Sequence, residues 1–330
     1  MNRRTFLAAT AAATTASISA APTRSGLGIA TTCYLSYLKP RDAHAFLEFC
    51  AERGAGGVQS MLPTDPAKFR ARCEQLGMFY EAMLQLSPDV EVMRASIRKA
   101  KESGATACRV GALSGRRYET FSTMDDWKKF VSDARAKIAA AAKAAEAEKL
   151  PLGLENHKDW TLEDALSLMK EFGHENFGML LDTGNNISLL DNPHQFVEAL
   201  APYATVTHLK DMAWQEHPSG FEMSEMVFGQ GQLDMLKIIN TIRKARPKTR
   251  MVLEMITRNP LVVPCLTEKY WLTMPHRPGT FLANTLRMVR ENKPSQPLPR
   301  MDQLSPEARL KLEDDNVKAC LAVAKTQYGL

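Results

Sequence analysis

The segment PLGLENHK, residues 151–158, contains a short apolar run that ends in polar and charged side chains. The segment GMLLDTGN, residues 178–185, repeats this pattern, with Asp182 directly after its apolar residues. Short apolar runs of this kind are typical of strands that are buried on both faces of a parallel sheet. In a parallel α/β barrel, reactive groups lie at the carboxyl ends of the strands. The two segments therefore predict parallel strands that carry functional residues at their ends.

Outward from these segments, the chain alternates short apolar runs with longer amphipathic stretches. The eight runs are 27–34, 56–60, 80–85, 107–112, 152–156, 178–182, 205–209 and 251–256. Helical patterns lie between them, for example at 40–53, 125–149 and 233–245. Eight strand–helix units predict an α/β fold of the (β/α)₈ TIM barrel type. An open doubly wound sheet is the alternative, but no glycine-rich phosphate turn follows the first run.

The chain divides into three predicted parts, which are an export signal at 1–24, a TIM barrel catalytic domain at 25–293 and a C-terminal linker and helix at 294–330. Prolines interrupt the helical pattern near residue 300, and 306–324 again shows amphipathic spacing. We expect this C-terminal helical extension to pack on the outside of the barrel or on a neighbouring subunit of a homo-oligomer.

Near the N-terminus, Arg3 and Arg4 are followed by Phe6, Leu7 and a weakly apolar Ala/Thr-rich stretch. This order resembles a twin-arginine export signal, which predicts a periplasmic location. A tail without a targeting role is the alternative interpretation. The stretch is too short and too polar for a membrane span.

The composition is that of an ordinary globular protein, with 45% hydrophobic and 24% charged residues and a net charge of +5. No basic block argues for a nucleic-acid partner. The six cysteines form no CxxC pair, and we expect them to be buried thiols. Cys50 and Cys73, on neighbouring predicted helices, are the best placed pair for a disulfide.

Four ionisable residues occupy the ends of the last four predicted strands. They are Glu155, Asp182, His208 and Glu254. Three buried carboxylates that converge without a cation would repel one another or take up protons. Three oxygen donors and one imidazole suit Mn²⁺, Mg²⁺, Co²⁺ or Zn²⁺. The pattern therefore predicts one divalent metal ion, whereas four helix caps or surface charges placed by chance are the alternative.

The segments around these residues are similar to those of the xylose isomerase-like TIM barrels, the sugar phosphate isomerase/epimerase family. The resemblance rests on LENH at 154–157, LDTGN at 181–185, HLKD at 208–211 and LEMITR at 253–258. It implies that Glu155 and Glu254 bind the metal and also exchange protons with the substrate. It implies that Asp182 and His208 serve as metal ligands only.

Three positions depart from the ketohexose epimerases of that family. Those enzymes have a His, an Arg and a Glu where this chain has Asn185, Trp214 and Thr161. The resemblance therefore supports metal binding but not the pocket for a free ketose.

Further residues near the strand ends are candidates for contact with the substrate. We predict substrate contacts for His157, Lys210, Asn185, Arg258 and Trp271. In an extended strand Lys210 points to the same side as His208. For Lys158 a substrate contact and a solvent-facing position both remain open, and Glu81 is expected to face outward.

These features predict a metal-dependent isomerase or epimerase that acts on a sugar or polyol with a ketone next to a hydroxyl group. Removal of a carbon-bound proton by a glutamate would give an enediolate. A lyase or dehydratase on keto-glycosides, keto-inositols or dehydroshikimate-like acids shares this first step and is the alternative. A sugar-binding barrel without activity is the third interpretation, and in all three the partner is a small sugar-like molecule.

Overall fold

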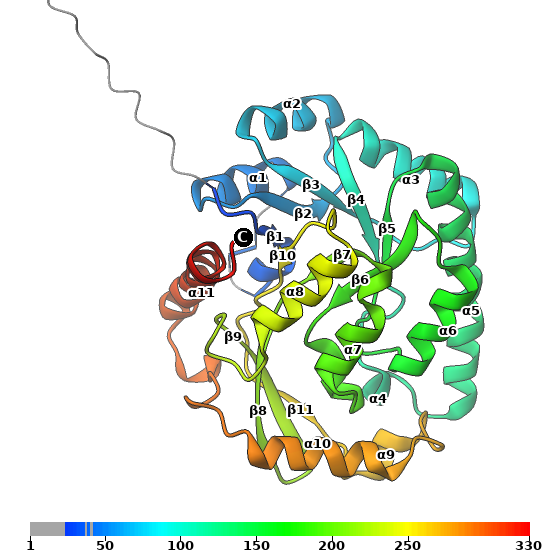
Figure 1. Cartoon of the computed structure of the whole chain (residues 1–330), viewed down its shortest axis with the longest axis vertical. Coiled ribbons are helices and arrows are strands. Elements are labelled where there is room, and N and C mark those ends of the chain that lie inside the picture. Colours follow the sequence, from blue (N-terminus) through cyan, green and yellow to red (C-terminus); the bar gives the residue numbers. More distant parts are fainter. Residues whose placement is uncertain (1–23, 37, 40–41) are drawn as a thin grey trace, which may run out of the picture.

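The computed structural model describes residues 24–36, 38–39 and 42–330, and it contains an eight-stranded parallel barrel with helices around it (Figure 1). The strands follow the order β10-β1-β2-β3-β4-β5-β6-β7. Their bounds are β1 Gly28–Ala30, β2 Gly57–Met61, β3 Phe79–Met83, β4 Ala105–Val110, β5 Leu152–Glu155, β6 Phe177–Asp182, β7 Ala204–His208 and β10 Val252–Leu253. The predicted (β/α)₈ fold is confirmed, because each of the eight apolar runs overlaps one strand of the barrel.

The barrel closes between β7 and β10. A parallel bridge joins Leu209 to Leu253, and the Leu209 amide donates to the Val252 carbonyl oxygen at 2.7 Å. The first and last strands are shorter than their apolar runs, because a 3₁₀ turn at Thr31–Tyr34 follows β1. The Cys33 thiol in that turn donates to the Leu253 carbonyl oxygen and accepts from the Met255 amide. These contacts replace the backbone pairing that would have extended β10.

The helices form an outer ring around the barrel, and their bounds follow local signals in the sequence. The ring comprises α1 Ala43–Glu52, α2 Pro66–Leu76, α3 Val90–Glu102, α4 Arg117–Thr120, α5 Met124–Glu148, α6 Leu162–Phe172, α7 Pro193–Leu200 and α8 Met235–Ala245. Side chains of Asp42, Asp65 and Asp89 accept hydrogen bonds from the first turns of α1, α2 and α3. Thr161 and Asp164 form a capping box at the start of α6.

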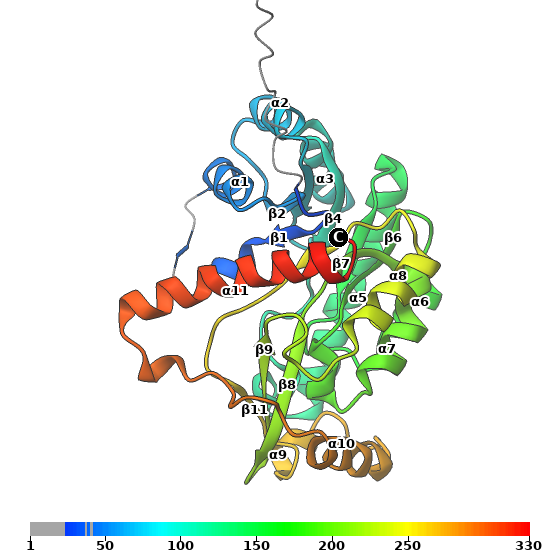
Figure 2. The same ribbon diagram turned by 60° about the vertical axis from the view of Figure 1, so that its left-hand side comes forward.

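A second, three-stranded antiparallel sheet extends from the carboxyl end of β7 (Figure 2). It consists of β8 Asp211–His217, β9 Gly220–Met226 and β11 Leu261–Val263. Helices α9 Glu268–Trp271 and α10 Gly279–Glu291 follow it. This sheet was not among the predicted elements, and it lies on the side of the barrel where the predicted site residues are.

The C-terminal helix α11 Pro306–Gln327 packs on the barrel beside the 3₁₀ turn at Thr31–Tyr34 that follows β1. Its buried face includes Val317, Cys320 and Leu321, and Asp314 accepts hydrogen bonds from Tyr34 and Arg53. At the end of the chain, the Ser25 hydroxyl donates to the Leu330 carbonyl oxygen at 3.1 Å.

Two further predictions concern the cysteines and the N-terminus. All six cysteines are buried free thiols, so Cys50 and Cys73 form no disulfide. The predicted export signal falls on residues 1–23, which lie outside the described part of the chain, and it stays a prediction. Within the described part, no helix is both long enough and apolar enough to cross a membrane.

Candidate metal centre

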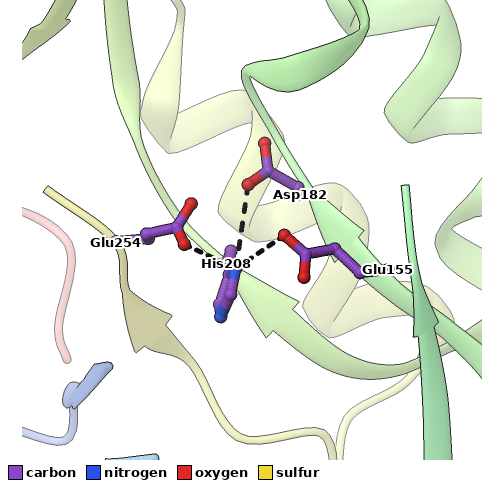
Figure 3. Close-up of side chains that lie close together, drawn as sticks. All are labelled: Glu155, Asp182, His208 and Glu254. Carbon is purple, nitrogen blue, oxygen red and sulfur yellow. Dashed lines mark ion pairs between the residues drawn. The ribbon is translucent and has the colours of Figure 1, made fainter. Parts of the chain in front are cut away.

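The structure brings the four predicted ligands together at the carboxyl end of the barrel (Figure 3). Glu155, Asp182 and His208 are the last residues of β5, β6 and β7, and Glu254 directly follows β10. All four side chains are buried, and one potential ligand atom from each lies within 4.8 Å of the others. The end-of-strand positions in the sequence therefore translate into one cluster.

The cluster is centred on the Nδ1 atom of His208. This atom lies 3.3 Å from Glu254 Oε1, 3.6 Å from Glu155 Oε1 and 3.8 Å from Asp182 Oδ2. It is fully buried, and it has no hydrogen-bond partner among the residues that the structure describes. Because a buried ring nitrogen without a partner is costly, its position among three carboxylate oxygens indicates a shared cation.

The other ring nitrogen of His208 is held by a chain of buried polar groups. Its Nε2 atom lies 2.7 Å from Gln59 Oε1, and Gln59 Nε2 donates to Glu81 Oε2 at 3.0 Å. Since Gln59 Oε1 can only accept, Nε2 donates to it, and Nδ1 is the ring nitrogen that faces the carboxylates. Burial raises the pKa of Glu81 to about 7. Such outer partners orient metal-binding histidines.

The three carboxylates are oriented in the same manner, each with one oxygen held from outside the cluster. Asp182 Oδ1 accepts from the backbone amides of Gly184 and Asn185 at 2.9 and 2.8 Å. Glu155 Oε2 accepts from Arg109 at 2.6 Å, and Glu254 Oε2 pairs with Lys210. Burial opposes ionisation of Glu155, but Arg109 and His208 together outweigh it and lower the pKa of this carboxyl.

The donor set fits a divalent ion. Three carboxylate oxygens and one imidazole nitrogen are ligands that Mn²⁺, Mg²⁺, Co²⁺ and Zn²⁺ accept. Each ligand is fixed in orientation before any ion binds, which limits the ordering cost of binding. The cluster is thus a buried group of acids and a histidine that can hold one metal ion.

Two of the predicted substrate-contact residues lie directly beside this cluster. Lys210 Nζ is 2.9 Å from Asp182 Oδ2 and 3.3 Å from Asn185 Oδ1. Lys158, whose position the sequence left open, is 3% exposed and donates to the same Asn185 oxygen at 2.5 Å. Lys210 and Lys158 therefore converge on one amide oxygen next to the metal ligands.

The other three candidates have different surroundings. His157 Nδ1 lies 3.1 Å from the Gly115 carbonyl oxygen, and burial together with the charge of Lys158 lowers its pKa to about 4. Arg258 forms a two-contact ion pair with the buried Glu225 of β9. Trp271 packs edge to face on Tyr270 and donates to the Cys265 carbonyl oxygen, so the contacts of its ring lie within its own loop.

Sequence reasoning was wrong about Glu81 and missed two further residues. Glu81 is 1% exposed and faces into the barrel, because β2 and β3 pair in a register that places it opposite Gln59. Gln59 and Arg109 were not predicted. The available signal was a polar residue inside an otherwise apolar strand, which is costly unless the residue has a partner.

Two of the positions that depart from the ketohexose epimerases have structural roles here. Thr161 caps α6, and Trp214 lies buried on β8 with its amide bonded to Gln232. Asp211, the first residue of β8, accepts hydrogen bonds from the backbone amides of Gly229, Gly231 and Leu233. It holds the loop at 229–233 beside the hairpin formed by β8 and β9.

The chain belongs to the Xylose isomerase-like TIM barrel family, whose model matches residues 47–274. Among curated proteins it is similar to the 3-oxo-isoapionate decarboxylase of Pectobacterium atrosepticum. The two are 26% identical over 226 residues, which cover 65% of this chain and 78% of the relative.

Solved structures share the fold at low identity. A xylose isomerase domain protein from Alicyclobacillus acidocaldarius has a TM-score of 0.55 and 14% identity, covering 91% of this chain and 99% of that protein. The IolI protein, solved with a bound zinc atom, has a TM-score of 0.54 and 13% identity, covering 80% and 95%. These two likenesses establish the barrel architecture.

Proposed function

We propose that the protein is a divalent-metal-dependent isomerase or epimerase that acts on a sugar or polyol with a ketone next to a hydroxyl group. One observation carries the proposal. Each of Glu155, Asp182, His208 and Glu254 directs one ligand atom to a common centre, while its second polar atom is held from outside. Such a preorganised centre is what metal-assisted proton transfer requires.

The two glutamates are the proposed proton-transfer groups. They lie on opposite sides of the His208 ring in Figure 3. One can remove the proton from the carbon that carries the hydroxyl group, and the other can return a proton from the opposite face. A bound divalent ion supplies the Lewis acid that polarises the ketone. The Lys210 ammonium, beside Asp182 and Glu254, stabilises the negative charge of the enediolate.

A lyase that shares this first step is the second candidate. After proton removal, a group on the next carbon would leave instead of a proton being returned. Two observations favour a lyase over an epimerase, namely the similarity to a decarboxylase, a lyase that releases CO₂ in place of a carbon-bound proton, and the structural roles of Thr161 and Trp214 at positions where the epimerases differ. Keto-glycosides, keto-inositols and dehydroshikimate-like acids are substrates of the required chemistry.

We also propose that the protein is exported by the twin-arginine pathway and works in the periplasm.

Glu254→Gln tests the proton-transfer role. We expect the wild type to carry about one divalent ion per chain and to exchange a carbon-bound hydrogen of keto-sugars with deuterium from the solvent, followed by NMR. The variant should fold, with an unchanged circular dichroism spectrum, and lose exchange by about 100-fold or more. Undiminished exchange in a fully metal-loaded variant would remove Glu254 from both roles. An ultraviolet-absorbing unsaturated ketone among the products would identify the lyase instead.

A further inference from the structure

Lys158 is a buried ammonium group that the proposed proton transfer does not use. It lies three residues after Glu155, and its side chain is 3% exposed. Its Nζ atom donates to Asn185 Oδ1 at 2.5 Å, and Lys210 Nζ approaches the same oxygen at 3.3 Å. One neutral amide oxygen thus stands between two ammonium groups.

Lys158 has no counter-charge in contact. Among the described residues no ion pair joins it to a carboxylate, whereas Lys210 pairs with two carboxylates and Arg258 with one. Asp182 and Glu225 act on it only through longer-range attraction. Burial, together with the charges of Lys210 and Arg258, lowers the pKa of Lys158 to about 8. A buried cation without a partner costs stability, and such a cost is typical of a functional site.

The arrangement of charged side chains around the candidate metal ligands indicates what Lys158 binds. Three of the four cationic side chains near the metal ligands contact a carboxylate: Arg109 pairs with Glu155, Lys210 with Asp182 and Glu254, and Arg258 with Glu225, whereas Lys158 contacts the Asn185 amide oxygen. Among the described residues, Lys158 is therefore the one of these four cations that has no carboxylate in contact. A divalent ion adds two positive charges in a buried region, where a net charge is costly. Transfer of a proton from the substrate to a glutamate leaves the net charge of the region unchanged, so only a negative charge that the substrate brings with it offsets part of the charge of the ion.

A cavity borders Arg258, a cation whose charge acts on Lys158. The side chain of Arg258 is 27% exposed, and the cavity, of about 250 Å³, borders Arg258 and Glu225 between the hairpin and the C-terminal linker. Further lining residues include Met255, Thr257 and Pro297. The ion pair of Arg258 lies close enough to Lys158 for their charges to interact, so the cationic region extends from the cavity toward the metal ligands.

We propose that Lys158 binds a carboxylate of the substrate, so that the protein acts on an acidic keto-sugar rather than on a neutral one. This inference rests on the proposed function and names its substrate class. Lys158 supplies the unpaired charge, Asn185 positions its ammonium group, and the metal centre binds the ketone end of the same molecule.

A matched pair of probes tests the inference. 2-Keto-D-gluconate and D-fructose differ in that a carboxylate replaces one hydroxymethyl group next to the ketone. We expect the metal-loaded wild type to bind the acid about tenfold more tightly or better in isothermal titration calorimetry. Lys158→Met should abolish this preference, whereas Lys128→Met, at an exposed lysine of α5, should keep it.

Thermal unfolding of the ligand-free variant gives a second, independent measurement. Removal of an unpaired buried charge should raise the Tm of Lys158→Met by about 2–4 °C. A lower Tm in this variant would mean that Lys158 is structural, and it would overturn the inference. Equal affinity of the wild type for both probes, binding of neither, or a preference that survives in Lys158→Met would overturn it too. The surviving preference would come from chelation of the metal by the acid.

The same samples distinguish this inference from the proposed function. If neither sugar exchanges a carbon-bound hydrogen with deuterium from the solvent, the proton-transfer proposal fails. The binding preference for the acid, and its loss in Lys158→Met, are measured without turnover and decide the carboxylate inference by themselves.

Discussion

The orientation of the His208 ring, and with it the position of Nδ1, depends on Gln59. This residue lies on β2, three strands away from β7 across the seam between β7 and β10. Gln59 on β2 accepts a hydrogen bond from the opposite ring nitrogen, and Glu81 on β3 fixes Gln59 in turn. Both residues come from the half of the barrel that supplies no ligand. The outer partners of a metal-binding histidine thus connect the two halves of the barrel at the level of single atoms.

Gln59→Leu tests this connection. Without the amide acceptor, the His208 ring loses its fixed tautomer and orientation, and we expect the affinity for the divalent ion to fall about 10–100-fold. Competition with a fluorescent chelator measures this change. Gln195→Leu, at an exposed glutamine of α7, is the matched control and should bind the ion like the wild type. An unchanged affinity in Gln59→Leu would separate this chain of hydrogen bonds from the metal centre.

The ligands were predictable at the residue scale and their partners were not. Each ligand follows an apolar run, and barrel geometry brings strand ends together whatever the details of packing. Gln59, Glu81 and Arg109 instead lie within strands, and their contacts depend on the register between strands and on side-chain direction. A single sequence does not specify either, so Glu81 was placed on the wrong face.

At the scale of elements, helix α11 is attached to the barrel by Asp314. Its carboxylate accepts from Arg53 and from the Tyr34 hydroxyl, and it pairs with Lys318. Burial opposes its ionisation, but these partners outweigh burial and lower its pKa to about 2. Because an aspartate in an unfolded chain has a pKa of about 3.9, this group stabilises the fold at neutral pH. The stabilisation is lost as the pH falls from about 4 toward 2.

Asp314→Asn should therefore reduce the free energy of unfolding by about 1 kcal/mol at pH 7. The difference from the wild type should shrink as the pH is lowered toward 3, because the unfolded wild-type chain then takes up a proton on Asp314 that the folded state binds only near pH 2. Urea unfolding at pH 7, 4 and 3 measures both effects. Asp315→Asn, next to it but paired only with Lys311, is the control and should change little. A difference that is equal at all three pH values would exclude a role for the Asp314 charge.

The antiparallel sheet was the element that sequence reasoning missed. Its first strand, β8, begins at Asp211, only three residues after β7 ends, so the two apolar patterns merge in the sequence. Strand β11 pairs with β9 across a gap of more than thirty residues, and no local signal indicates such pairing. The long helices α5 and α11, by contrast, follow directly from spacing and caps.

At the scale of the whole molecule, metal binding and folding are linked. The ligands come from four strands that meet only in the folded barrel, so an ion that binds there stabilises the native state alone. At an ion concentration about 100 times the Kd, the gain is about 2.7 kcal/mol. We expect Mn²⁺ to raise the Tm by about 5–10 °C above that of chelator-treated protein, measured by calorimetry.

Glu254→Gln should show a much smaller rise in the same calorimetric experiment, because it lacks one ligand charge. A rise of equal size in this variant would mean that Mn²⁺ binds elsewhere on the protein.

The contact between Ser25 and Leu330 has a consequence for how the chain can be rearranged. Both residues lie at the amino ends of the barrel strands, and Arg243 at the end of α8 donates to the carbonyl oxygens of Tyr328 and Gly329 there. A circular permutant in which a short linker joins residue 330 to residue 24 would need no rerouting across the barrel. Fusion partners attached near these residues would extend away from the carboxyl end of the barrel, where the four candidate metal ligands lie.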